Sequence, residues 1–518
     1  MAVPLEVRLV DRPTNTVVID THNEGPRQFV VRERAGTVYV GKNQNPQPRN
    51  GKTIGYIYNG EFVPRNASVS DAKPEFLSFG TSALVYSHSH DLFKDLCAVF
   101  SLPDALKIIT LASLKVLKPH IANSRMRAQY ERSFISIYYP GVALSANTIC
   151  KFLNNLGTDS IRRREFYKVR MLKIAKDHHI AIDGSLIQDN SIVNDLSAFS
   201  RKAKVKGCQD ISLLYAYDIE TNEPICADIF PGNSIDASSY HDFISRSNLK
   251  KGIIVADKGF PPEAISDILL ENKDLHYLTP LKRNDRRIEQ YDMYNFEAVF
   301  LKNGKAIACK KCKTENNKWL YSFVDAKKAG YEHAAFIENA VKHKNYNQET
   351  HANKMESFGT IVFESDEEFP CEVAYVIYED RWKLELVFRH YKSDLEFDTT
   401  NVQGDFSVLG ETFVNLISTI ITCRILEQFR IAGLNDNNTY AEIMDDLSSA
   451  WRTVDAPSEP KRSDGCWIHT LKYVHELLEK LELSKPDFEK RDKLKPDRKK
   501  IKPEFVGPKR PRGRPKKL

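Results

Sequence analysis

The segment GIIVADKG, residues 252–259, contains four apolar residues in succession that end at an acid. A short apolar run of this kind is typical of a buried β-strand. Asp257 follows the run directly, and Lys258 and Gly259 come next. We expect the carboxylate of Asp257 to project at the rim of a sheet, where the strand stops. An aspartate here is also a common turn or helix-capping residue, so the segment by itself leaves both interpretations open.

A second apolar run ends at an acid earlier in the chain. In the segment HIAIDGS, residues 179–185, a predicted strand stops at Asp183, and Gly184 and Ser185 allow a sharp bend after it. Two acids at strand ends favour a shared functional role over two unrelated turns.

The region 177–283 alternates between strand and helix patterns. After the first predicted strand, residues 212–218 and 225–230 have the pattern of a hairpin. A helix follows from Asp236, then the second buried strand, a helix opened by prolines, and a strand at 276–279. Three antiparallel strands followed by parallel strands with crossover helices is the order of a ribonuclease H-like sheet. We therefore expect an α/β fold with such a core.

The remaining regions divide more simply. Strand-like runs and a polar stretch after residue 283 predict a β-rich insertion between the last strand of the core and the helix that contains Glu385. The patterns give seven segments: 1–78, a small β-rich module; 79–176, helical; 177–283, the first part of the core; 284–370, the insertion; 371–434, the second part of the core; 435–484, helical; and 485–518, a basic tail.

Four polar residues near the end of the core share one face of a predicted helix. They are Tyr378, Arg381, Glu385 and Lys392. At about 100° per residue, these positions fall within an arc of roughly 60°. Apolar residues recur at three- and four-residue steps on the adjoining face, as in a helix that packs against a sheet: Leu384, Phe388, Tyr391 and Leu395. A solvated face with an Arg381–Glu385 ion pair is the alternative.

The two strand-end acids and Glu385 offer the ligands for a pair of hard divalent cations. Phosphodiester hydrolysis or transfer needs an activated oxygen nucleophile and a stabilised leaving oxyanion, and two Mg²⁺ ions about 4 Å apart meet both needs. Carboxylates are the ligands for Mg²⁺, and we expect Mn²⁺ to substitute. Arg381, Lys392 and the hydroxyl of Tyr378 would then bind phosphates.

The composition limits the class of protein. At 518 residues, with 42% hydrophobic and 28% charged residues, the chain is typical of a globular protein with several domains. No apolar leader follows Met1, and polar residues interrupt the most apolar helical stretch, 413–426. We therefore expect a soluble protein that is not exported.

The cysteines favour a reducing compartment, because there are nine, an odd number, scattered along the chain. Cys309 and Cys312 form a CxxC pair. A zinc site needs four ligands, and no second pair follows at the usual distances. Two thiols on a strand are the simpler interpretation, and a structural zinc site is the alternative.

The C-terminal tail is strongly basic. Residues 485–518 hold 15 Lys or Arg and 5 Asp or Glu, whereas the rest of the chain holds 60 and 64. Six prolines and few large apolar residues leave the tail without a core, so we expect a flexible arm that binds polyanions. Arg512, Gly513 and Arg514 resemble the centre of an AT-hook, which fits the narrow minor groove of A·T tracts. A generic basic tail is the alternative.

Two further regions have weaker DNA-binding patterns. Residues 145–156 have the pattern of a helix-turn-helix recognition helix, with an ordinary packing helix as the default. A basic stretch between the first two predicted strands is either a DNA contact or a solvated loop. Its cations are Arg201, Lys202, Lys204 and Lys206.

The motifs together resemble those of one bacterial family. The spacing of Tyr378, Arg381, Glu385 and Lys392 is similar to the signature of the insertion-sequence-four group of DDE transposases. Other segments also match that group: Asp183 with Gly184; Pro231, Gly232, Asn233 and Asp236; Asp257 to Phe260; and Arg381 with Trp382. The resemblance covers roughly residues 177–434, half of the chain.

The resemblance implies a DNA transposase with a ribonuclease H-like core. Asp183, Asp257 and Glu385 would bind two Mg²⁺ ions, and the enzyme would cleave the ends of an insertion element and join them to target DNA, often through a hairpin at the element end. The other residues of the signature would contact DNA phosphates: Tyr378, Arg381 and Lys392.

The resemblance also implies partners and a compartment. The partners would be the terminal inverted repeats, target DNA and a second copy of the chain, because two ends must be held together. No membrane and no small-molecule cofactor is expected, and the protein would work at the nucleoid in a bacterial cytoplasm. The region 1–170 would bind the element ends, an inference from its position alone.

Two rival functions stay open. The first is a nuclease or resolvase that cuts without joining, and the second is a catalytically silent DNA-binding protein derived from a transposase. The complete set of acids counts against the second. Trp319 in the insertion is a candidate to stack on a flipped base, with a core tryptophan as the alternative.

Overall fold

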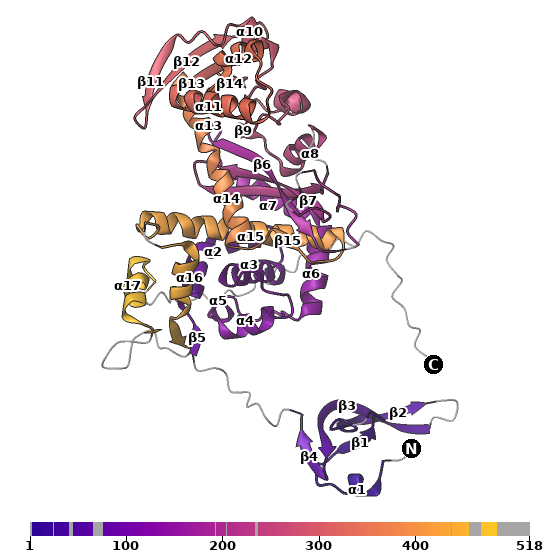
Figure 1. Ribbon diagram of the computed structural model, residues 1–518. Coiled ribbons are helices and arrows are strands. Elements are labelled where there is room, and N and C mark those ends of the chain that lie inside the picture. Colours follow the sequence, from indigo (N-terminus) through magenta and orange to yellow (C-terminus); the bar gives the residue numbers. More distant parts are fainter. Residues whose placement is uncertain are drawn as a thin grey trace, which may run out of the picture. The chain divides into compact units, whose positions relative to one another are not determined.

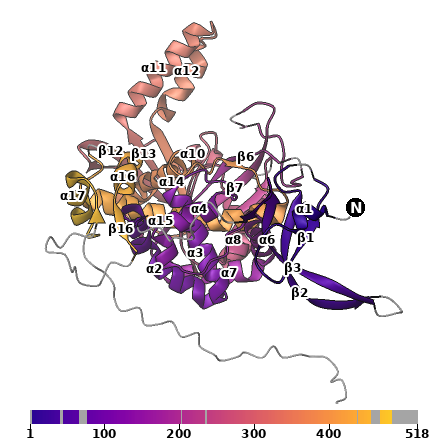
Figure 2. The same ribbon diagram turned by 90° about the horizontal axis from the view of Figure 1, so that it is seen from below.

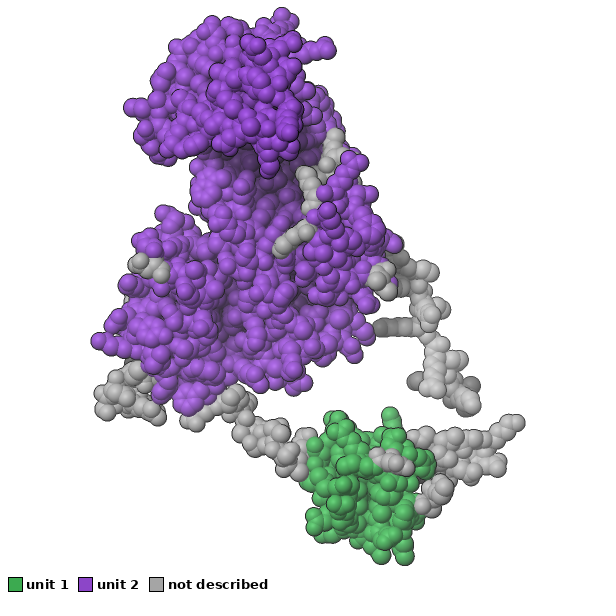
Figure 3. All heavy atoms as spheres, viewed as in Figure 1, with its two compact units in different colours: residues 1–75 green, residues 76–518 purple. Residues whose placement is uncertain are grey.

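The computed structural model has two compact units, Met1–Glu75 and Phe76–Leu518, which Figure 3 shows in different colours. It describes residues 3–483 except 24, 41–44, 66–75, 192, 202, 204, 234–236, 437 and 455–467. The predicted basic tail, with Arg512, Gly513 and Arg514, lies outside the described residues, as do Lys202, Lys204 and Asp236.

The first unit is a four-stranded antiparallel sheet with a short helix before it. In sheet order its strands are β1 (Thr16–Asp20), β2 (Phe29–Val40), β3 (Asn45–Tyr58) and β4 (Glu61–Pro64), and the helix is α1 (Leu5–Arg8). Asn59 and Gly60 both have positive φ in the turn between β3 and β4, which is the geometry of a tight hairpin. Residues 76–78, which the sequence analysis assigned to this module, instead form β5 of the second unit.

The second unit is built on a large mixed sheet, so the expected α/β fold is confirmed. In chain order the central strands are β6 (His179–Asp189), β7 (Gln209–Asp218), β8 (Glu223–Pro231), β9 (Lys251–Ala256) and β10 (Asp274–Pro280). β6, β7 and β8 are antiparallel, whereas β9 pairs parallel with β6 and β10 pairs parallel with β9. The crossovers contain α8 (Ala237–Ser247), η1 (Pro262–Ile265) and α9 (Ser266–Glu271). Strand types and order follow the sequence prediction.

The region of the predicted β-rich insertion contributes four strands, and these extend the sheet. Its elements are α10 (Arg286–Gln290), β11 (Ala298–Lys302), β12 (Lys305–Lys313), β13 (Trp319–Asp325), α11 (Ala326–Lys342), α12 (Gln348–Lys354), η2 (Met355–Ser357) and β14 (Thr360–Ser365). β14 pairs with β10 on one side and β13 on the other, because the free edge of β10 needs hydrogen-bond partners. The insertion also holds helices, and Figure 2 shows two of them, α11 and α12, projecting from the unit.

Helices form the rest of the second unit. They are α2 (Gly80–Val99), α3 (Leu102–Leu117), α4 (Met126–Arg132), α5 (Ile135–Tyr138), α6 (Ala146–Thr158), α7 (Ser160–Leu172), α13 (Cys371–Asp380), α14 (Trp382–Ser393), α15 (Asp405–Ile431), α16 (Tyr440–Ser448) and α17 (Lys472–Lys480). Three short strands complete it: β15 (Thr399–Thr400), β16 (Trp451–Thr453) and β17 (Ile468–His469). β15 pairs with β6, whereas β5, β16 and β17 form a small sheet.

Helix α15 is the centre of the helical half. It packs against β8 of the large sheet and against the helices α2, α3 and α6, and it lies between the sheet and these helices (Figure 1). A Cβ on Gly157 of α6 would stand 1.6 Å from the carbonyl oxygen of Phe406, so only glycine permits this close approach. Helix α6 is thus a packing helix, with Ile149 and Leu153 buried.

Helix α15 also has the composition of a membrane span. Among the described residues it alone is long and apolar enough, with a mean hydropathy of 1.5 over its most apolar window. However, 83% of that window is buried inside the unit. A helix that is apolar on all sides is expected at the core of a large fold.

Candidate active site

Strands β6 and β9 place Asp183 and Asp257 at the same rim. The two strands are parallel, and their register aligns Ile182 with Ala256. Asp183 and Asp257 are the next residues, so they leave the paired region on neighbouring strands that lie about 4.8 Å apart.

Strand β6 does not stop at Asp183, which corrects the prediction. It continues to Asp189, because β7 pairs with it over its whole remaining length. Asp183 therefore sits inside a strand, opposite Tyr215 of β7, and its Oδ1 accepts a hydrogen bond from the N–H of Gly184 at 2.7 Å. Asp257 does follow its strand directly and is exposed.

The predicted signature helix is divided into α13 and α14 at Arg381. At this residue the backbone has φ −54° and ψ −30°, which is 3₁₀ geometry. The N–H of Arg381 donates to the carbonyl of Tyr378, and the N–H of Leu384 donates to the carbonyl of Arg381, both three residues apart. A 3₁₀ turn inside a helix changes the angles between side chains. The single arc predicted for the signature is therefore interrupted in its middle.

Arg381 connects two of the three acids. One of its guanidinium nitrogens lies 3.2 Å from Oδ2 of Asp183, and another lies 3.2 Å from Oε1 of Glu385. Because both nitrogens belong to one planar fork, the two carboxylates lie within about 9 Å of each other. The Arg381 side chain is only 13% exposed, which strengthens both interactions.

Electrostatic interactions indicate that Asp257 belongs to the same cluster as Asp183 and Glu385. Burial raises the pKa of Asp183, and the nearby charges of Asp257 and Glu385 raise it further. The N–H of Gly184 and the charge of Arg381 act in the opposite direction. One arginine therefore does not compensate the whole cluster, and its three carboxylates suit a hard divalent cation.

The three carboxylates do not form a closed metal cage in this arrangement. Among the described residues, one group of three or more potential ligands has all its ligand atoms within 4.8 Å of one another, and it is His178, Asp218 and Glu220. Arg381 lies between Asp183 and Glu385 instead. Neither Cys309 nor Cys312 belongs to that group, so the described residues give the CxxC pair no support as a zinc site.

Two tyrosines border the acids. Tyr378 of α13 is half-buried, its ring lies 4.4 Å from that of Phe363, and the Arg381 guanidinium lies 5.5 Å from its centroid. Burial raises the pKa of Tyr378. Tyr240 of α8 interacts electrostatically with Asp183 and Asp257, and burial raises its pKa to about 12, so its hydroxyl stays neutral. The sequence analysis missed Tyr240, because no motif marks it.

Lys392 and Trp319 are the two remaining residues that the sequence analysis proposed for the site. Lys392 is half-buried on α14, seven residues after Glu385, which is about 10 Å along a helix. Trp319 is half-buried on β13, packs beside a buried apolar cluster, and has Lys311 and Lys313 over its ring at 4.8 and 5.5 Å. These contacts favour the core interpretation of Trp319.

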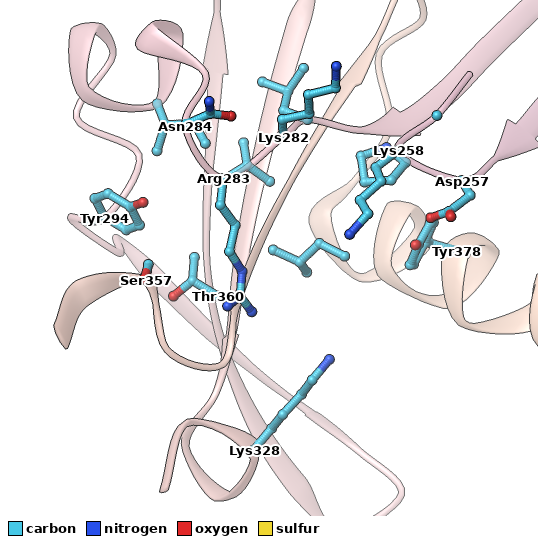
Figure 4. Close-up of a pocket in the computed structure, with 16 residues that line it drawn as sticks. Asp257, Lys258, Lys282, Arg283, Asn284, Tyr294, Lys328, Ser357, Thr360 and Tyr378 are labelled. Carbon is cyan, nitrogen blue, oxygen red and sulfur yellow. The ribbon is translucent and has the colours of Figure 1, made fainter. Parts of the chain in front are cut away.

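A basic cavity of about 760 Å³ opens beside Asp257 (Figure 4). Its cationic lining comes from the turn after β9, the turn after β10 and the start of α11: Lys258, Lys282, Arg283 and Lys328. A second cavity of about 270 Å³ shares Tyr378 and Lys328 with it and is lined by Arg381 and the exposed Trp382. The sequence analysis missed Lys282, Arg283 and Lys328, although the pair 282–283 lies only a few residues after the predicted strand at 276–279.

Comparison with known proteins finds one matching family model. Residues 175–421 match the family model described as a transposase DDE domain. The match spans slightly less than half of the chain, runs from before β6 into α15, and includes all three acids. This segment is therefore similar to a transposase DDE domain.

Solved structures and curated proteins add less. The chain resembles a piggyBac transposase in a synaptic complex with hairpin DNA, at 11% identity and a TM-score of 0.37, over 68% of this chain and 71% of that one. It also resembles the Mos1 transposase in a paired-end complex with the left transposon end, at 13% identity and a TM-score of 0.15, over 30% of this chain and 58% of that one. Scores this low carry no argument about function. No curated protein matches the chain.

Proposed function

We propose that the chain is a DDE transposase of the insertion-sequence-four group, which cleaves the ends of an insertion element and joins them to target DNA. The observation that carries this proposal is the convergence of Asp183, Asp257 and Glu385 around Arg381 within the matched DDE domain. The strand order β8, β7, β6, β9, β10 supports a ribonuclease H-like core.

In this mechanism Asp183, Asp257 and Glu385 hold a pair of divalent cations, Mg²⁺ or Mn²⁺. The bound cations would activate the attacking oxygen and stabilise the leaving one. The acids lie on two strands and a helix of one packed unit, which fixes their positions before the DNA arrives.

Arg381 serves two purposes in the proposal. Its guanidinium pairs with Asp183 and Glu385. Its planar fork would also suit a DNA phosphate at the same rim. The neutral hydroxyl of Tyr378 donates to the same strand, and Lys392 holds a phosphate further along α14.

The basic cavity beside Asp257 supports the path of the DNA strand. Lys258, Lys282 and Lys328 line it together, and backbone phosphates are the ligands that such a row of cations attracts. Arg283 is already paired with Glu332 at 2.7 Å, so we assign it a structural role in this wall.

The partners follow from the reaction. We propose that the protein works as a homodimer on terminal inverted repeats and target DNA in the bacterial cytoplasm, because two ends must be cut and joined together. The tail motif of Arg512, Gly513 and Arg514 would add non-specific affinity for A·T-rich DNA.

A cleavage and joining assay tests the function. The full chain is incubated with Mg²⁺ and DNA that carries the repeats flanking its own coding region. Joined products support the transposase, cuts without joining support the nuclease, and binding alone supports the silent regulator.

A matched pair of variants assigns the result to the site. Asp257→Ala should abolish cleavage and leave end binding intact, whereas Glu271→Gln, an exposed acid on α9, should change neither. Cleavage by the Asp257→Ala protein at the rate of the unmutated chain would refute the metal assignment.

A further inference from the structure

A second cluster of titratable groups lies where β6 begins and β7 ends. His178 precedes β6, Asp218 is the last residue of β7, and Glu220 lies in the turn before β8. The register aligns Ile180 with Asp218, so the cluster is about four strand residues, or roughly 13 Å, from Asp183. It is therefore separate from the candidate active site.

The two acids of this cluster are held in place by hydrogen bonds. Nδ1 of His178 lies 2.9 Å from Oδ2 of Asp218, and the hydroxyl of Thr221 donates to the same oxygen at 2.6 Å. The N–H of His179 donates to Oε2 of Glu220 at 2.7 Å, and its ring nitrogen Nδ1 contacts the other oxygen. The ligand atoms of His178, Asp218 and Glu220 all lie within 4.8 Å of one another.

The cluster crowds negative charge in a partly buried place. The side chain of Asp218 is only 2% exposed, and that of Glu220 is 35% exposed. The ion-pair partners of these acids are the imidazoles of His178 and His179. One imidazole and two carboxylates gathered this closely offer three ligand atoms to a cation.

We propose that His178, Asp218 and Glu220 bind a divalent transition-metal ion of the zinc type. One imidazole nitrogen and two carboxylate oxygens suit Zn²⁺ better than Mg²⁺, which prefers oxygen ligands alone. Ligand atoms around tetrahedral Zn²⁺ lie about 3.4 Å apart, and the ligand atoms of this cluster, all within 4.8 Å of one another, are close to that spacing. Water takes the fourth position, because His178 and Glu220 are both reached by solvent.

His179 orients one of the ligands. Its contacts to both oxygens of Glu220 hold that carboxylate toward the cluster, as an outer-shell partner does. The ion would fasten the start of β6 to the turn between β7 and β8. This proposal does not depend on the proposed function.

Calorimetric titration with Zn²⁺ tests the site. The full chain with Asp183→Asn, Asp257→Asn and Glu385→Gln serves as the parent, so that the catalytic acids do not contribute. We expect one tight site in the parent and at least tenfold weaker binding after Glu220→Gln or His178→Gln. A parent that binds no Zn²⁺ overturns the proposal.

A matched control uses a similar trio that does not converge, with His276 on β10 and two acids just after β14. His276 lies 3.1 Å from Asp366 and 3.6 Å from Glu367, yet these three do not meet the common 4.8 Å limit. His276→Gln should leave Zn²⁺ binding unchanged. Equal loss in His276→Gln and Glu220→Gln, or no loss in Glu220→Gln, overturns the assignment.

A second measurement needs no variant. In crystals of the unmutated chain grown with Zn²⁺, the anomalous difference map at the zinc edge should show a peak between His178 and Glu220. A map with zinc peaks at other places and none there overturns the proposal.

Discussion

Two acid–arginine clusters on the same sheet differ in their charge balance. At the start of β8, Glu223 pairs with two arginines, Arg170 at 2.5 Å and Arg424 at 2.6 Å. At the rim of β6, Arg381 alone pairs with Asp183 and Glu385 at 3.2 Å each. Burial opposes ionisation of both Glu223 and Asp183, but the pKa of Glu223 is lowered and that of Asp183 is raised.

The difference separates a structural ion network from a candidate reaction site. Arg170 and Arg424 both pair with Glu223, and Arg424 also pairs with Asp91 at 2.6 Å, so the charges in this network balance and it ties α2, α7, β8 and α15 together. One cation for a group of acids leaves negative charge without compensation, and that excess attracts a metal ion or a proton. The sharpest experiments therefore change one cluster and compare it with the other.

The largest effect is expected from Asp183→Asn. Asparagine keeps the shape of the aspartate side chain but removes the charge that would hold a cation. The transition state then loses several kcal/mol of stabilisation, which lowers the cleavage rate at least ~1000-fold. Single-turnover cleavage of end DNA measures the rate. The thermal midpoint should stay the same or rise slightly, because the substitution relieves like-charge crowding. A rate within tenfold of the unmutated chain would contradict the site.

The comparison also shows how far the sequence could predict this site. The acids and Arg381 could be predicted from local patterns. These patterns are apolar strand segments that run to an acid and a helix with fixed residue spacing, and both are short-range features. The pairing of Ile182 with Ala256, which aligns Asp183 with Asp257, is a long-range register. A single sequence contains no signal for it, although the strand order makes it possible.

The second-largest effect is expected from Glu223→Gln. The neutral amide leaves the buried guanidinium of Arg170 without its counter-charge and leaves Arg424 with Asp91 as its remaining carboxylate partner, which costs about 3 kcal/mol of unfolding free energy at pH 7. Urea unfolding of the second unit measures this. Glu165→Gln is the matched control, because its surface pair with Lys168 contributes less than ~1 kcal/mol.

The pH dependence of that loss has a definite sign. The pKa of Glu223 is lower in the folded state, so its stabilising effect is present above the unfolded pKa of about 4.3 and disappears as the pH falls through the folded pKa. The difference between the unmutated chain and Glu223→Gln should thus be constant from pH 7 to about 5.5 and shrink below pH 4. A difference that grows in acid would mean that the carboxylate is not the stabilising group.

Helices without a buried apolar stripe could not be predicted from the sequence. Helix α11 buries only Ala340, so its residues show no apolar face, and the sequence analysis found only a polar stretch. The edge pairing of β14 with β10 was missed for a different reason, because nothing local distinguishes a strand that extends a sheet from one in a separate subdomain. The cavity residue Lys328 lies on that same helix, which explains its absence from the predicted site.

The third effect is expected from Arg381→Lys. A lysine keeps the charge but cannot reach Asp183 and Glu385 with two nitrogens at once, so cleavage should fall about 10- to 100-fold. Arg389→Lys, at an exposed position of the same helix, is the control. Steady-state cleavage should show the loss in kcat, with KM for end DNA changed less. A loss confined to KM would mean that Arg381 only binds DNA and does not organise the acids.

The smallest effect is expected from Lys328→Ala. Lys328 lines both cavities at the acid-rich rim but makes no base-specific contact in our proposal, so the variant should bind end DNA a few-fold more weakly at every sequence. The slope of log affinity against log salt should fall by about 1, because one phosphate contact is lost. Lys176→Ala removes an exposed lysine near the opposite end of β6 and should leave the slope unchanged. Equal salt slopes for both variants would place the DNA path away from the cavity. A change of slope in Lys328→Ala alone would place the DNA strand at the rim near Asp183 and Asp257, where the negative charge is only partly compensated.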